Sequence, residues 1–143
     1  MKQMIGIASD HAGVELKEML KQDLLRLGHE VNDLGTHDGH SVDYPDFANQ
    51  LAEWMKSHGQ AKGVLVCGSG IGMSIAANRH KHIRAAMCHD GTSAALSRRH
   101  NNANVLCLGA RLTGSEVARD ALKAFLTTEF EGGRHEGRVA KLC

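Results

Sequence analysis

The sequence predicts an α/β fold in which helices cover both faces of one five-stranded parallel sheet. Strand-like and helix-like segments alternate along all 143 residues, and this alternation is typical of parallel sheets. Three of the strand-like segments are almost wholly apolar, as expected of strands that are buried on both faces. The length fits one domain with a full core, and no repeat or linker divides it. We therefore expect residues 1–143 to form a single three-layer domain with strand order 2-1-3-4-5.

The alternation of apolar and polar residues places each element in turn. Strands are expected at residues 4–9, 30–33, 64–67, 83–88 and 105–108. The first helix carries Leu16, Leu20 and Leu24 on one face and ends before Gly28. The remaining helices are expected after the segment Asp43-Tyr44-Pro45, over 71–78, from residue 90 or 91, and over 113–128.

The composition argues against several classes of function. The net charge of +1 lacks the basic excess of a nucleic-acid-binding protein, and no apolar segment is long enough to span a membrane. The N-terminus runs directly into a strand pattern rather than a signal peptide. We expect a soluble, cytoplasmic protein without a disulfide framework, because Cys67, Cys88, Cys107 and Cys143 have no paired spacing.

The segment Cys67-Gly68-Ser69-Gly70-Ile71-Gly72 carries the strongest functional signal. Its thiol follows a buried strand, and glycine at every second position leaves backbone N–H groups unhindered where a helix begins. The N-terminus of a helix binds anions and favours the thiolate form of a nearby cysteine. The segment therefore predicts a base beside an oxyanion-binding loop, which an enzyme that forms a carbanion needs.

The same glycines have two other interpretations. Gly68 and Gly70 resemble the start of a dinucleotide-binding fingerprint, and Asp90 follows the next strand. However, Met73 occupies the last glycine position of that fingerprint, and the loop follows the third strand rather than the first. A tight turn with positive φ explains one glycine more easily than three. Binding of a small anion is the favoured interpretation.

Further polar residues are expected near this loop or at helix ends. With the expected strand order, the turn at Ser9–Gly13 faces the loop across a crevice, where open parallel sheets bind ligands. Asp10 and His11 in that turn suit both a helix cap and a sugar-phosphate contact. His100 equally suits a charged helix end and a functional role.

Charged residues elsewhere suit either a binding role or an exposed surface. Arg111, Arg134 and Arg138 are candidate phosphate ligands because guanidinium groups match phosphate oxygens, and the last two share one helical face. Four histidines are expected at the surface without forming a metal site: His37, His40, His80 and His82.

Taken together, these segments resemble the family of ribose-5-phosphate isomerase B and the galactose-6-phosphate isomerase subunits. The matching segments span nearly the whole chain in order: Ser9–Gly13, Asp43–Pro45, Cys67–Arg79, Ser97–Leu106, Gly109–Arg111 and Glu131–Val139. The resemblance implies a Rossmann-like or flavodoxin-like domain that forms a homodimer, or a tetramer of paired dimers. It also implies isomerisation of ribose 5-phosphate and ribulose 5-phosphate, a step of the pentose phosphate pathway, without metal or organic cofactor.

The resemblance further implies a role for each matching residue. Cys67 is the base that moves a proton between C1 and C2, and Met73 stands where some members carry a glutamate instead. Ser69 hydrogen-bonds the O1/O2 edge, and the N–H groups of Gly68, Gly70 and Gly72 stabilise the enediolate. His100, helped by Asp10, opens the sugar ring.

The remaining matching residues bind the substrate. Asn101 and Tyr44 position the hydroxyl groups, and the phosphate is held by His11, Arg111, Arg134 and Arg138. The family's site lies at the dimer interface, so the tail at 131–143 is expected to reach a partner subunit. Two alternatives stay open: a hexose-6-phosphate isomerase that acts on allose or galactose phosphates, and a nucleotide-binding module supported only by Asp90.

Overall fold

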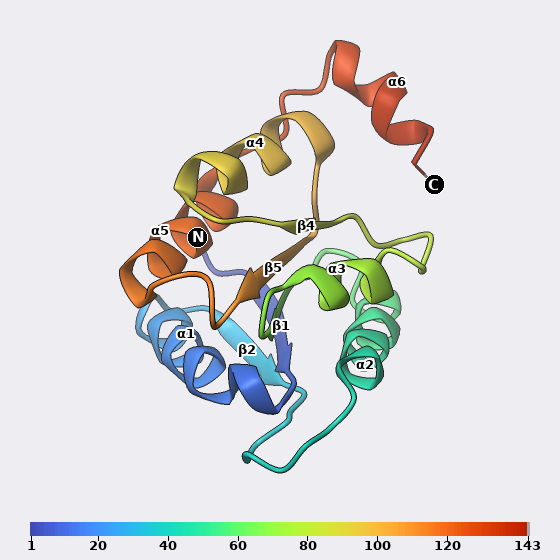
Figure 1. The fold of residues 1–143 in the computed structure, drawn as a ribbon. Coiled ribbons are helices and arrows are strands. Elements are labelled where there is room, and N and C mark those ends of the chain that lie inside the picture. The colour runs from blue at the N-terminus through green and yellow to red at the C-terminus, as the bar shows by residue number, and fades with distance from the viewer. Residues whose placement is uncertain (143) are drawn as a thin grey trace.

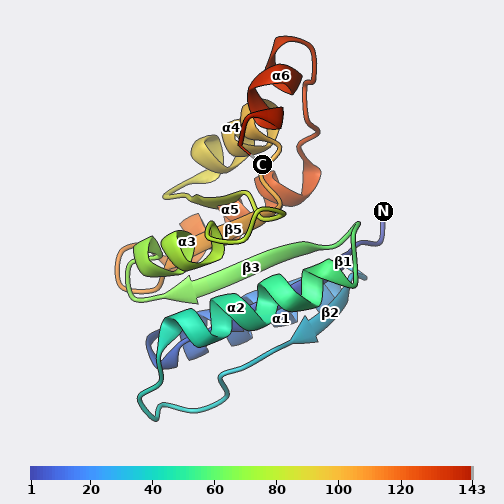
Figure 2. The ribbon, with the colours of Figure 1, turned by 90° about the vertical axis from the view of Figure 1, so that its right-hand side faces the viewer.

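The computed structural model describes residues 1–142, and Cys143 lies outside the described residues. One parallel sheet lies between two layers of helices (Figure 1, Figure 2). Its strands are β1 (Met4–Ser9), β2 (Glu30–Asp33), β3 (Lys62–Cys67), β4 (Ala85–Met87) and β5 (Val105–Gly109). The helices are η1 (His11–Gly13), α1 (Val14–Arg26), α2 (Tyr44–Lys56), α3 (Ile71–Ala77), α4 (Gly91–Asn101), α5 (Ser115–Thr127) and α6 (Arg134–Ala140). The predicted fold class is confirmed. No helix among the described residues is long and apolar enough to cross a bilayer.

The strand order is β2-β1-β3-β5-β4, which exchanges the last two strands of the predicted order 2-1-3-4-5. β3 pairs with β5 from Gly63 and Val105 to Cys67 and Gly109, and β4 pairs with the other side of β5. All five residues of β5 are buried, whereas β4 is three residues long and only partly buried. An apolar strand is stable in the interior of a sheet, and a short strand suits the edge. The pairing of β1 with β3 is unaffected by this exchange.

Two apolar cores flank the sheet. Leu20 and Leu24 of α1 pack with Phe125 of α5 on one face. Leu51 of α2 and Met73 of α3 pack on the other face. The helices thereby stay close to the sheet and hold the loops at its two edges in place.

The C-terminal tail is the segment expected to reach a partner subunit. It folds into α6, which contacts α4 and stands at the outer end of the molecule in both views (Figure 1, Figure 2). The Glu131 N–H donates a hydrogen bond to the Arg99 carbonyl oxygen at 3.1 Å. Arg134 and Arg138, whose spacing predicts a shared helical face, both lie on this helix.

A buried ion pair joins α1 to β2. Lys17 is 1% exposed, and its Nζ lies 2.7 Å from both carboxylate oxygens of Asp33. Lys21 and the Gly35 N–H also donate to this carboxylate. Burial by itself raises the pKa of Asp33, but these hydrogen bonds outweigh it and lower the pKa below its ordinary value of 3.8.

We predict that Lys17→Met lowers the free energy of unfolding by about 3 kcal/mol, because a buried carboxylate loses its closest partner. The ion pair stabilises the wild type above pH 3.8, and this contribution is lost as the pH falls through the lower pKa of the folded state. Urea denaturation should therefore show a wild-type advantage at pH 7 that shrinks below about pH 4. Lys21→Met, at a partly exposed position, is the matched control and should cost under about 1 kcal/mol. An equal loss in both variants would contradict the prediction.

Candidate active site

The candidate site is built on the turn that follows β3. Cys67 is 4% exposed and ends the strand, and the Gly70 N–H points to its Sγ at 3.2 Å. Gly70 has φ of 80°, which only glycine adopts without strain. A Cβ on Gly109 would lie 2.6 Å from the Ser69 backbone, so the tip of β5 holds this turn tightly. The thiol and the glycine loop therefore lie together, as predicted.

Arg111 reaches the same loop from the end of β5. Its N–H donates to the Gly68 carbonyl oxygen at 3.0 Å. Its guanidinium lies over Gly68, 3.5 Å from the place where a Cβ would be. Ser69 is half-buried, and its Oγ accepts from the Ile71 N–H at 3.2 Å. A cationic group and a hydroxyl therefore border the loop beside the thiol.

Tyr44 completes this side of the site from the start of α2. A Cβ on Gly72 would lie 2.5 Å from the Tyr44 ring, so the ring packs directly on the first turn of α3. Tyr44 itself is 40% exposed. A glycine at position 72 is thus required for the contact between these two helices.

The turn after β1 faces the loop, as the sequence predicts. The Asp10 N–H donates to the Val66 carbonyl oxygen at 3.1 Å, which places Asp10 beside the end of β3. Its carboxylate caps η1 by accepting from the Ala12 N–H at 3.0 Å. His11 Nδ1 accepts from the Val42 N–H at 3.2 Å, and this contact orients the imidazole. Asp10 is a helix cap and a residue of the candidate site at once.

Four other residues predicted for the site lie at the opposite end of the sheet, where the strands begin. α4 begins after β4 and runs back along the strands, so His100 and Asn101 stand at its far end. The Gly63 N–H at the start of β3 donates to the Asn104 carbonyl oxygen at 2.9 Å. Cys67 lies four residues further along, about 13 Å at ~3.3 Å per residue. Arg134 and Arg138 are exposed on α6, beside this far end. One chain therefore does not bring these four residues to the thiol.

The amino-acid sequence matches known proteins over nearly its whole length. The family model described as Ribose/Galactose Isomerase matches residues 5–142. A putative sugar phosphate isomerase of Bacillus subtilis is 47% identical over 96% of this chain and 93% of its own. The ribose-5-phosphate isomerase B of Escherichia coli is 43% identical over 94% and 91% of the two chains. The chain belongs to the ribose/galactose isomerase family.

Solved structures of similar isomerases share the fold. The ribose 5-phosphate isomerase of Thermotoga maritima has a TM-score of 0.95 and 51% identity, covering 98% of this chain and 97% of that one. The enzyme of Mycoplasma genitalium with bound ribulose-5-phosphate has a TM-score of 0.94 and 40% identity, covering 97% and 93%. A D-erythrulose-4-phosphate isomerase of Pectobacterium atrosepticum is 42% identical over 96% of this chain and 91% of its own. The predicted family is confirmed.

Other residues considered for catalysis or nucleotide binding have structural roles in this isomerase. Burial raises the pKa of the Cys88 thiol and of the Cys107 thiol, so both favour the neutral form. Met73, at the position where the resemblance implies a glutamate in some members, is fully buried in the core. Asp90 caps α4 by accepting from the Ser93 N–H at 2.7 Å, which leaves the nucleotide interpretation without support.

Two of the four histidines expected at the surface differ from that expectation. His37 and His40 are exposed. His80 and His82 are half-buried, and their Nε2 atoms hydrogen-bond to Asn49 and to the Ala52 carbonyl of α2. They anchor the turn after α3 to the neighbouring helix.

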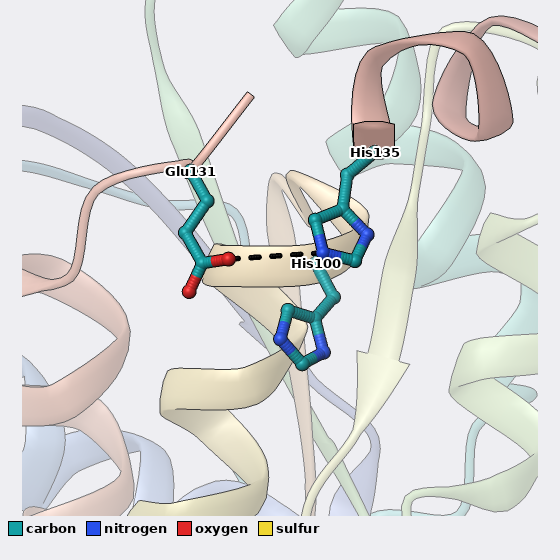
Figure 3. Close-up of side chains that lie close together, drawn as sticks. All are labelled: His100, Glu131 and His135. Atoms are coloured by element: carbon teal, nitrogen blue, oxygen red, sulfur yellow. Dashed lines mark ion pairs between the residues drawn. The ribbon is translucent and has the colours of Figure 1, made fainter. Parts of the chain in front are cut away.

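Sequence reasoning missed two neighbours of His100. His135 stacks on the His100 ring with centroids 4.5 Å apart, and Glu131 lies beside both (Figure 3). Burial lowers the pKa of His135; the neighbouring His100 and the arginines of α6 lower it further, whereas Glu131 opposes this effect. The only local signal was the four-residue spacing of Glu131 and His135, which the glycines between them obscure.

We predict that Gly70→Ala lowers the free energy of unfolding by about 2 kcal/mol, because alanine at positive φ is strained. The added Cβ would also lie 3.0 Å from the Leu108 carbonyl carbon. Gly59→Ala, where a Cβ meets nothing within 4 Å, is the matched control and should change stability by under about 0.5 kcal/mol. Guanidinium denaturation of both variants checks this. Wild-type stability of Gly70→Ala would rule out the required turn.

Proposed function

We propose that this chain interconverts ribose 5-phosphate and ribulose 5-phosphate through an enediolate, without metal or organic cofactor. The observation that carries the proposal is the Cys67 thiol at the tip of β3, beside the Gly70 N–H and the glycine loop. An E. coli relative bears this activity in its name, and the similar M. genitalium structure holds ribulose-5-phosphate. The reaction would be a cytoplasmic step of the pentose phosphate pathway.

The chemistry needs a base that removes a proton from the carbon beside an aldehyde. Cys67 is the proposed base, because Cys88 and Cys107 are buried thiols with raised pKa values. It takes the proton from C2 and returns it to C1, while the hydroxyl proton of O2 passes to O1, so the sugar is isomerised with no net change in protons. Ser69 hydrogen-bonds the O1/O2 edge of the substrate. The N–H groups of Gly68, Gly70 and Gly72 stabilise the negative charge of the enediolate.

Substrate binding is proposed for the residues around this loop. Arg111 lies over Gly68, and His11 stands in the turn after β1, next to the end of β3; both would contact the phosphate. Tyr44 packs on the loop side of α3 and positions a sugar hydroxyl. Asp10 is nine-tenths buried beside β3 and assists ring opening.

A second copy of the chain is proposed to complete the site. His100 for ring opening and Asn101 for hydroxyl binding stand at the far edge of the sheet, together with Arg134 and Arg138 for the phosphate. A homodimer that places this edge against the partner's glycine loop assembles two equivalent sites, and two dimers can pair further into a tetramer. The tail from 131 onward would then face the partner subunit.

A six-carbon substrate is the second candidate. The matching family model covers ribose and galactose isomerases, and a relative that is 42% identical is a four-carbon D-erythrulose-4-phosphate isomerase. The family thus accepts sugars of different length. Turnover of allose 6-phosphate and galactose 6-phosphate beside ribose 5-phosphate distinguishes the candidates by kcat/KM.

We predict that Cys67→Ala lowers kcat by about 10³-fold, because general base catalysis contributes factors of this size. The assay is conversion of ribose 5-phosphate in the presence of a chelator, which should leave wild-type turnover intact. Cys88→Ala, at another buried thiol, is the control and should retain turnover. A Cys67→Ala enzyme of wild-type activity would move the base to another residue.

We predict that two inactive variants restore activity when they share a dimer. In a mixed dimer of Cys67→Ala and His100→Asn, one of the two shared sites contains both substitutions and the other contains neither. Random mixing should recover about one quarter of wild-type activity, since half of the dimers are mixed. Co-expressed, differently tagged chains provide the measurement, and each variant alone is the control. No recovery in purified mixed dimers would contradict a shared site.

A further inference from the structure

Three side chains from separate segments converge at the far edge of the sheet (Figure 3). They are His100 of α4, Glu131 of the connection after α5, and His135 of α6. One donor atom from each lies within 4.8 Å of the other two. Within residues 1–142, no other three histidine, cysteine or acidic side chains come this close.

The backbone holds this cluster in place. The Glu131 N–H donates to the Arg99 carbonyl oxygen at 3.1 Å, which fixes Glu131 to the end of α4. Gly132 and Gly133 then reverse the chain with φ values of 69° and 55°. The His135 N–H donates to the Gly132 carbonyl oxygen at 3.0 Å, so His135 starts α6 over His100. The fold therefore fixes the backbone positions from which the three side chains project.

His135 carries a buried polar atom without a partner. The residue is 6% exposed, and its Nε2 has no hydrogen-bond partner. The nearest acidic atom, Glu131 Oε1, lies 3.7 Å away. Buried polar atoms in folded proteins are almost always paired with a protein group, a water or an ion. This nitrogen therefore points to a ligand in the space between the three side chains.

Two imidazoles and one carboxylate form a donor set for a particular class of ion. Mg²⁺ and Ca²⁺ prefer oxygen ligands, whereas Zn²⁺ and its neighbours bind imidazole strongly. Arg134 and Arg138 lie close by on α6 and oppose weakly held cations, which further favours the stronger binders. We propose that His100, Glu131 and His135 bind a divalent late transition-metal ion, with Zn²⁺ as the representative.

Binding requires the three donor atoms to move closer together. Ligands at ~2.1 Å from a tetrahedral ion lie about 3.4 Å from one another, and the donor atoms here lie within 4.8 Å. The Glu131 side chain is 51% exposed, and His100 is half-buried. Rotation of these two side chains brings them toward His135, and water takes the fourth position.

Occupancy of this site inhibits turnover, a consequence that rests on the proposed function. A metal-bound imidazole of His100 has no free lone pair to accept the proton of the sugar hydroxyl during ring opening. The ion therefore acts as a reversible inhibitor that a chelator removes, and the reaction itself needs no metal.

We predict that chelator-treated, full-length protein binds about one Zn²⁺ per chain in isothermal titration calorimetry. Glu131→Gln and His135→Gln should each weaken binding by at least about tenfold. His80→Gln is the matched control, because His80 and His82 form a second histidine pair without a carboxylate; it should bind as the wild type does. No binding by the wild type, or unchanged binding in Glu131→Gln, would overturn the site. Glu131 is exposed, so this variant tests the site even if His135→Gln fails to fold.

Inhibition is measured separately, as ribose 5-phosphate turnover against Zn²⁺ concentration. Glu131→Gln should keep wild-type turnover without metal and need at least about tenfold more Zn²⁺ for half-inhibition. Equal sensitivity of the two proteins would overturn inhibition through this site and point instead to the Cys67 thiol. The calorimetric result stands apart from this assay, so failure of the proposed reaction and failure of the metal site are distinguishable.

Discussion

The parallel pairing of β3 with both β1 and β5 determines where the candidate site lies. This pairing sets Ser9 opposite Val66 and Cys67 opposite Gly109, so three strand ends meet at one edge of the sheet. The turns that follow have little room, since a Cβ on Gly109 would lie 2.6 Å from the Ser69 backbone. The thiol and the anion-binding N–H groups are therefore held by backbone packing. A site positioned in this way needs little reorganisation when charge develops on the substrate.

The same pairing explains why one chain holds only part of the proposed machinery. In parallel β-α units, each helix starts at the edge where the strands end and finishes at the opposite edge. His100 at the end of α4 is thus separated from Cys67 by the length of β3. A second copy of the chain can remove this separation, because its far edge can approach the first copy's strand tips. The proposed dimer then follows from topology rather than from any single contact.

The cluster of His100, Glu131 and His135 gives the far edge of the sheet a second chemical property besides its proposed role in ring opening. The histidine proposed to open the sugar ring must remain free to exchange protons, yet here it stacks on a second imidazole with a carboxylate alongside. The proximity that suits proton exchange also suits metal binding, since both need neutral imidazole nitrogens. Reversible inhibition by zinc-like ions would then be a consequence of how α6 packs on α4.

The sequence by itself determined the class of fold, most element boundaries and the glycine loop after Cys67. These features follow from local rules: apolar strands, helix periodicity and the freedom of glycine. The tertiary structure decided three things that depend on distant contacts. It placed β5 between β3 and β4, brought the helix at residues 134–140 into contact with α4, and stacked His135 on His100. Each depends on burial against a segment far away in the chain, and a local pattern carries no information about that neighbour.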